Sequence, residues 1–144
     1  DTTFFDDKKG TRWLFINQSN DKYDDHNSEL YIYKTDKKFN KIVPHHLNPV
    51  ITDSRFARSG GNIFYNKEGL LLRPSQKNIN NFYGKSLNLR IIKKLTLKMY
   101  EEVDYVSLNA DFKKNINGIH HFSKNNKIYA IDLKYKNLMY DFLS

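Results

Sequence analysis

Polar side chains that could bind a ligand recur at matching positions before three phenylalanines of the chain. The phenylalanines are Phe5, Phe64 and Phe122, which lie 59 and 58 residues apart. The residues two positions before them are Thr3, Asn62 and His120, and those four positions before them are Asp1, Gly60 and Gly118. Because side chains alternate between the two faces of a strand, residues two positions apart are expected to share a face.

Each phenylalanine lies in a segment of the same kind: a strand-like opening, a polar turn and a second apolar run. The three segments read FFDDKKGTRWLFIN from Phe4, IFYNKEGLLLRPSQ from Ile63 and HFSKNNKIYAIDLK from His121. The turns have hairpin length and carry Asn, Asp or Gly for unusual backbone angles. Each repeat is therefore predicted to open with a hairpin at residues 6–10, 66–69 or 124–127. Helix is indicated only at residues 95–102 and 138–143.

A β repeat of about 58 residues favours a four-stranded propeller blade. The alternative is a β-sandwich, although a sandwich rarely repeats one hairpin at a fixed interval. The 144 residues would form one all-β domain of about two and a half units, with repeats starting near residues 1, 60 and 118. The first strand of each blade lines the channel of a propeller, so a group of polar residues is expected to converge there as a ligand site. They are Asp1, Thr3, Arg58, Asn62 and His120. The alternative is that they satisfy neighbouring backbone.

A second group of candidate ligand-binding residues follows the second strand of the middle repeat. Arg73 offers a fork for carboxylate or phosphate, Gln76 an amide for hydroxyls, and Tyr83 a ring for a sugar face. The alternative is that Arg73 pairs with a surface carboxylate and Tyr83 packs in the core.

Composition limits the possible partners and compartments. The formal charge of +8 comes mainly from Lys, whereas Arg is the better fork for phosphates and base edges, so no specific nucleic-acid partner is expected. No apolar run approaches the roughly 20 residues of a membrane span. The absence of cysteine excludes disulfides and thiolate metal sites, and it is compatible with the cytoplasmic location that we favour without excluding export.

The order of several motifs resembles that of a known family. The motifs are DTTFF (1–5), RWLF (12–15), NPV (48–50), DSRFARSGG (53–61), LRPSQ (72–76), YG (83–84), LT (95–96), YEE (100–102) and GIHH (118–121). Together they resemble the later blades of the five-bladed propeller domain typified by the N-terminal domain of plant glucosamine inositolphosphorylceramide transferase. That family is similar in fold to glycoside hydrolase family 43. The resemblance implies a partial five-bladed propeller of two and a half to three blades, with the earlier blades missing.

The resemblance implies a carbohydrate-associated domain. It would bind a glycan or a sugar nucleotide as an accessory module of a glycosyltransferase or formyltransferase-type protein. One alternative is a fragment of a glycosidase-like hydrolase whose catalytic carboxylates lie in the missing blades. Another is a basic module that binds protein or nucleic acid. Open sheet edges would favour a homo-oligomer in each case.

Catalysis and metal binding have little support in the sequence. Glycoside hydrolysis needs two carboxyl groups across the scissile bond, and Asp1 and Asp53 are the only candidates, so enzymatic activity is undecided. The adjacent His120 and His121 would point to opposite faces of a strand and could not share one metal. His120 resembles a histidine near the central metal of some five-bladed glycosidases. A central divalent cation is therefore the one cofactor that the resemblance suggests, and no other cofactor is expected.

Overall fold

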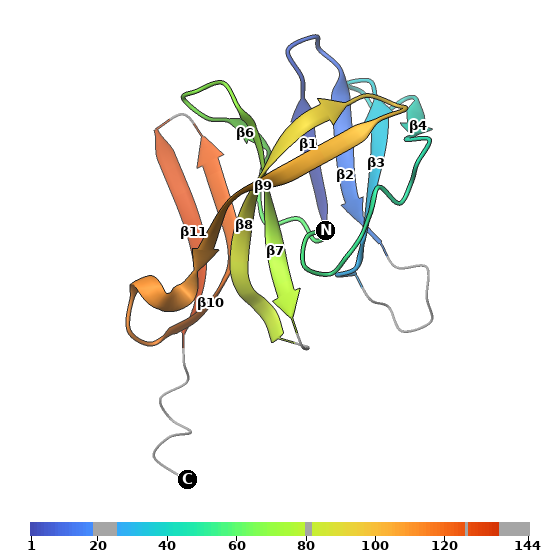
Figure 1. Ribbon diagram of the computed structural model, residues 1–144. Coiled ribbons are helices and arrows are strands. Elements are labelled where there is room, and N and C mark those ends of the chain that lie inside the picture. The colour runs from blue at the N-terminus through green and yellow to red at the C-terminus, as the bar shows by residue number, and fades with distance from the viewer. Residues whose placement is uncertain (19–25, 80–81, 126, 136–144) are drawn as a thin grey trace.

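The chain folds into three antiparallel sheets that stand side by side (Figure 1). This computed structural model describes residues 1–18, 26–79, 82–125 and 127–135. The first sheet contains β1 (Thr2–Asp6), β2 (Arg12–Asn17), β3 (Glu29–Thr35), β4 (Ile42–Pro44) and β5 (Ile51–Thr52). The second contains β6 (Phe64–Tyr65), β7 (Leu71–Ile79), β8 (Phe82–Leu95) and β9 (Tyr100–Asn109). The third contains β10 (Ile116–Asn125) and β11 (Ile128–Tyr135), after a short 3₁₀ helix, η1 (Ala110–Phe112). The all-β class predicted from the sequence is confirmed.

The repeated hairpins are present, and the first two close in the same way. In the β1–β2 turn, Oδ1 of Asp7 accepts the backbone N–H groups of residues 9 and 11. In the β6–β7 turn, Oδ1 of Asn66 accepts those of residues 68 and 70. Gly10 and Gly69 end the turns with the same φ of 79°, a left-handed angle that favours glycine. The first two repeats therefore share both their apolar pattern and the hydrogen bonds that close their turns.

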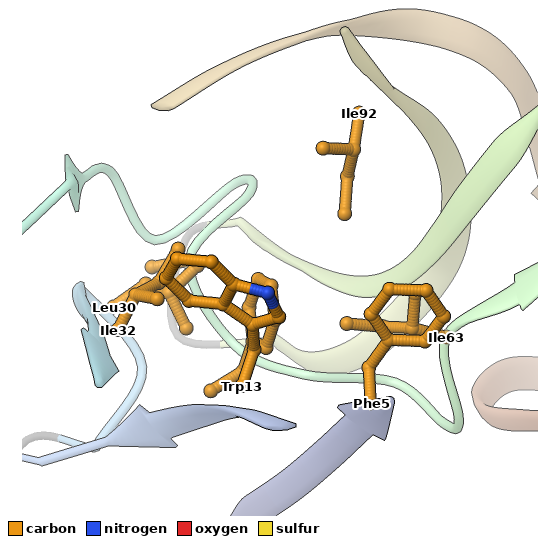
Figure 2. Close-up of a cluster of buried hydrophobic side chains, with 8 residues drawn as sticks. Phe5, Trp13, Leu30, Ile32, Ile63 and Ile92 are labelled. Atoms are coloured by element: carbon orange, nitrogen blue, oxygen red, sulfur yellow. The ribbon is translucent and has the colours of Figure 1, made fainter. Parts of the chain in front are cut away.

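Two apolar cores separate the three sheets. Figure 2 shows the first core, in which Phe5, Trp13, Leu30 and Ile32 of the first sheet meet Ile92 of β8. The second core lies between the second and third sheets, and its buried members are Leu72, Leu87, Leu89, Ile119 and Phe122. Neighbours on one strand divide between the cores, since Leu71 packs against the first and Leu72 belongs to the second. The second sheet is therefore covered on both faces, as expected for a blade between two others.

The predicted helix at residues 95–102 is wrong. β8 ends at Leu95 and β9 begins at Tyr100, so this segment is the tip of a long hairpin. Oγ1 of Thr96 accepts the backbone N–H of Met99 at 2.9 Å, which closes a turn instead of capping a helix. Leu97 at this tip packs against the first core. The second helical segment, residues 138–143, lies outside the described residues.

A buried ion cluster on the middle sheet joins this sheet to the segment between β5 and β6. Arg73 of β7 donates to both carboxylate oxygens of Glu102 on β9, at 2.8 and 2.7 Å. Arg90 of β8 and the Tyr100 hydroxyl also donate to this carboxylate, each at 2.5 Å. Arg73 further donates to the Phe56 carbonyl, at 2.7 Å, in the segment before β6. Only 1% of the Arg73 side chain and 5% of the Glu102 side chain are exposed. Removing either partner would leave a buried, unpaired charge, which would lower the free energy of unfolding strongly.

Replacing Glu102 by Gln should destabilise the fold strongly. Burial by itself raises the pKa of the Glu102 carboxyl, but the charge of Arg73 and the hydrogen bonds from Arg73 and Tyr100 outweigh it, so this pKa is lowered. The carboxylate thus adds stability above an unfolded pKa of about 4.3, and this stability is lost as the pH falls through the lowered folded pKa. We expect Glu102→Gln to cost about 3 kcal/mol at neutral pH and less in acid.

Urea unfolding across a pH series measures this effect. Glu101→Gln is the matched control, because Glu101 precedes Glu102 on β9 but makes a half-exposed pair with Lys94. This control should cost under about 1 kcal/mol. Equal losses in the two variants would contradict the role given to the buried cluster.

Candidate ligand-binding cleft

A cleft of about 450 Å³ opens where β1 and the third sheet approach the segment before β6. Its lining is polar and comes from all three sheets and from the segment between β5 and β6. The lining residues are Asp1, Thr2, Thr3, Ser59, Gly61, Gln76, His120, His121 and Asp132. Of the residues predicted to bind a ligand, the structure therefore places Asp1, Thr3, Gln76 and His120 at one site.

Two glycines allow the third sheet to reach this site. The Gly60 carbonyl accepts the Phe122 backbone N–H at 2.7 Å, and the Gly60 N–H donates to the Pro74 carbonyl at 3.0 Å. Gly61 has a φ of 145°, and a Cβ added there would lie 1.8 Å from the Phe122 carbonyl oxygen. Residues 60 and 61 thus bridge β7 and β10, and the close approach leaves no room for a side chain.

Gln76 presents an acceptor that no group among the described residues satisfies. Its Nε2 donates to the Ser59 carbonyl at 3.0 Å, which fixes the orientation of the amide because a carbonyl can only accept. The remaining Oε1 is buried and has no hydrogen-bond partner in the part of the chain that the structure describes, and the same holds for Oγ of Ser59. Both residues are more than nine-tenths buried and line the cleft. Unsatisfied polar atoms at a cleft wall are available to hydrogen-bond a ligand or water.

His120 occupies a bulge of β10 and pairs with a carboxylate. The register passes from Ile119 opposite Leu133 to His121 opposite Asp132, so His120 is the extra residue on its strand. Its Nδ1 lies 2.9 Å from Oδ2 of Asp132. The ring packs on Gly84, where an added Cβ would lie 2.9 Å from Cδ2 of His120. A bulge of this kind re-aims a side chain.

The expectation that His120 and His121 face opposite ways assumed a regular strand. Both residues line the cleft, because the bulge breaks the alternation. Nε2 of His121 lies 2.7 Å from Oγ of Ser123. Within the part of the chain that the structure describes, no group of three or more His, Cys, Asp or Glu residues could hold a metal ion. The described residues therefore offer the expected central cation no cluster of these four residue types.

Two predicted binding residues support the framework of the site. Nε of Arg58 donates to the Asp1 carboxylate at 2.8 Å, and its Nη1 donates to Asn27, also at 2.8 Å. Asn62 bonds with both its amide atoms to the backbone of Lys124 on β10, at 2.9 and 2.8 Å. Arg58 thus holds the start of β1, and Asn62 holds the third sheet against the segment before β6.

Arg73 and Asp53 are absent from the cleft lining. The alternative interpretation of Arg73 was an ion pair with a surface carboxylate. Arg73 does pair with a carboxylate, but this carboxylate is the buried Glu102. Asp53 accepts hydrogen bonds from Arg55, which lower the pKa of its carboxyl. A general acid of a glycosidase needs a raised pKa. The side chain of Tyr83 lies outside the described part of the structure.

The sequence interpretation missed Ser59 and Asp132. Ser59 precedes the two bridging glycines, and its burial follows from the contact that they make. Asp132 lies across the β10–β11 hairpin from His121, so the predicted hairpin register could have placed it near the histidines. No sequence motif marks either Ser59 or Asp132 as a functional residue.

Gly61→Ala should destabilise the fold and open the contact between the third sheet and the cleft. The new Cβ would collide with backbone, which cannot move without separating β10 from residues 60–62. Gly69→Ala is the control: Gly69 also has a positive φ, but nothing lies within 4 Å of its added Cβ. Thermal melts should show a loss of about 1 kcal/mol for the control and a clearly larger loss for Gly61→Ala. Equal losses would mean that the close approach is unimportant.

No helix in the described residues is long and apolar enough to span a bilayer.

Comparison with known proteins identifies the family. No curated protein and no solved structure matches the chain. A family profile described as glucosamine inositolphosphorylceramide transferase 1, N-terminal, matches residues 1–137. The chain therefore belongs to the glucosamine inositolphosphorylceramide transferase 1 N-terminal family.

Proposed function

We propose that this domain is a saccharide-binding accessory module of a glycosyltransferase-related protein, and that the cleft is its binding site. The observation that carries the proposal is the buried, unsatisfied Oε1 of Gln76 at the cleft wall. A buried acceptor without a donor costs free energy, and a ligand hydroxyl or amine that donates to it removes that cost. The family is consistent with a transferase-associated role.

The lining favours a ligand rich in hydrogen-bond donors. Oε1 of Gln76 can only accept, whereas Oγ of Ser59 can donate or accept. The carboxylates of Asp1 and Asp132 also line this site and add further acceptors to it, each beside a basic side chain, Arg58 or His120. A neutral or amino-substituted saccharide therefore fits better than the sugar nucleotide that the sequence also allowed.

The arrangement of the sheets supports the proposal that the domain is part of a larger propeller. The first strands of the first and third sheets and the segment before β6 meet at the cleft, as the inner strands of neighbouring blades do. Such a channel end is a common place for a ligand. A glycosidase-like activity has less support, because Asp53, one of the two candidate carboxyl groups, is absent from the cleft lining and its pKa is lowered by Arg55.

Ser59→Ala should weaken saccharide binding without destabilising the fold. The hydroxyl has no partner among the residues that the structure describes, so its removal breaks none of the hydrogen bonds seen there. One lost ligand hydrogen bond corresponds to about a three- to tenfold weaker affinity. Ser75→Ala is the matched control, since Ser75 Oγ is also buried and unsatisfied but Ser75 is absent from the cleft lining.

Titrations followed by NMR would use methyl glycosides of glucose, mannose and glucosamine, with uridine diphosphate glucose for comparison. We expect the methyl glycosides to shift resonances of His120 and Gln76 and the nucleotide to bind more weakly. Loss of binding in Ser75→Ala equal to that in Ser59→Ala would contradict the site. Absence of any saccharide effect would contradict the function.

We also propose that the third sheet associates with a second copy through β11. Among the described strands β11 pairs only with β10, and its exposed apolar residues are Ile128, Tyr129, Ile131 and Tyr135. An apolar edge strand is a site for further strand pairing. Ile131→Lys should weaken self-association about tenfold or more in analytical ultracentrifugation, whereas Phe112→Lys, which lies on η1, should not. A wild-type protein that stays monomeric at high concentration would contradict this proposal.

A further inference from the structure

The positive charge of the molecule is concentrated at the end formed by its hairpin turns. The β1–β2, β6–β7 and β10–β11 turns and the β8–β9 tip all lie at the upper end in Figure 1. We call this end the turn surface and define it by residues 7–11, 36–42, 46–48, 66–70, 96–99 and 127–128. Its exposed lysines include Lys8, Lys37, Lys38, Lys67, Lys98 and Lys127.

Contacts between the turns make this surface continuous. Nη1 of Arg12 donates to the Lys37 carbonyl at 3.3 Å, which joins the first hairpin to the β3–β4 turn. The backbone N–H of His46 donates to the Leu97 carbonyl at 2.9 Å, which joins residues 46–48 to the β8–β9 tip. One shallow hollow is lined by Lys8, Lys9 and Leu97, and a second by Lys67 and Lys124.

Two of the three acidic residues of the turn surface, Asp7 and Asp36, are directed into their own turns, and the third, Glu68, is exposed. Asp7 and Asp36 accept backbone N–H groups of the turns that they begin. Asp6 is paired with Arg12 at 2.7 Å. The lysines therefore dominate what an approaching partner meets, and they account for much of the net charge of +8.

Apolar side chains project from the same turns. Leu47 is 61% exposed and Met99 is 48% exposed, and both lie where residues 46–48 meet the β8–β9 tip. Phe39 and Ile128 are exposed on the β3–β4 and β10–β11 turns. Lysines interleaved with protruding apolar side chains match a lipid interface, where cations meet headgroups and apolar groups enter the acyl boundary.

We propose that the turn surface docks the domain on an anionic lipid membrane. A nucleic acid fits less well, because the exposed cations named above are Lys, whereas base and phosphate recognition favours Arg forks. Leu47 and Met99 would also gain nothing from a phosphate backbone but would be buried at a bilayer surface. This inference is independent of the saccharide site, since it uses none of the residues that line the cleft.

Vesicle co-sedimentation tests the proposal with the whole chain. We expect binding to vesicles of phosphatidylcholine with phosphatidylserine, weak binding to phosphatidylcholine alone, and loss of binding at high salt. The double variant of Lys37→Gln and Lys38→Gln should bind about fivefold more weakly for each lysine removed. The control carries Lys85→Gln and Lys114→Gln, which are exposed lysines outside the turn surface and should leave vesicle binding unchanged.

The apolar residues separate a membrane from a nucleic acid. The double variant of Leu47→Ser and Met99→Ser should lower vesicle binding several-fold. The control is Phe112→Ser, which removes an exposed apolar side chain on η1 and should leave vesicle binding unchanged. A DNA duplex that bound more tightly than the anionic vesicles at equal salt would overturn the proposal in favour of a nucleic-acid surface. It would also be overturned if phosphatidylserine made no difference or if both lysine pairs reduced binding equally. Circular dichroism of each variant serves as the control for an intact fold.

Discussion

The buried carboxylate of Glu102 is the interaction on which the arrangement of the sheets depends. It neutralises Arg73 and Arg90 on the two central strands of the middle sheet, and Arg73 in turn donates to the Phe56 carbonyl in the segment that leads to the cleft. An unpaired charge at this depth would cost more than the apolar contacts around it could offset. The cluster therefore fixes where the segment before β6 lies on the middle sheet.

The position of that segment decides the geometry of the cleft. The Arg58 carbonyl accepts the backbone N–H of Gln76, and Gln76 returns a side-chain hydrogen bond to the Ser59 carbonyl. Gly60 then bonds to β10. A chain of short contacts thus runs from the buried ion cluster to the third sheet, which explains why the unsatisfied atoms of Ser59 and Gln76 can be held in place without a ligand.

The sequence predicted the hairpins and the class well, because period-two patterning and turn residues act locally. It predicted side-chain direction less well where the strands are irregular. β6 begins only at Phe64, so Asn62 is not a strand residue, and the bulge at His120 breaks the face assignment. Arg73 illustrates a different limit: an arginine that binds a ligand and one that pairs with a buried acid look the same in a sequence. The deciding partner, Glu102, lies 29 residues away.

The distribution of lysine shows what composition hides. A general excess of lysine over acidic residues predicts solubility and nothing about a partner. The fold gathers many of these lysines at the turns, because polar residues with unusual backbone angles are concentrated there. Carboxylates such as Asp1 and Asp132 instead line the cleft between the sheets. One chain thereby presents a lysine-rich surface at its turns and a separate polar cleft, and only the three-dimensional arrangement separates them.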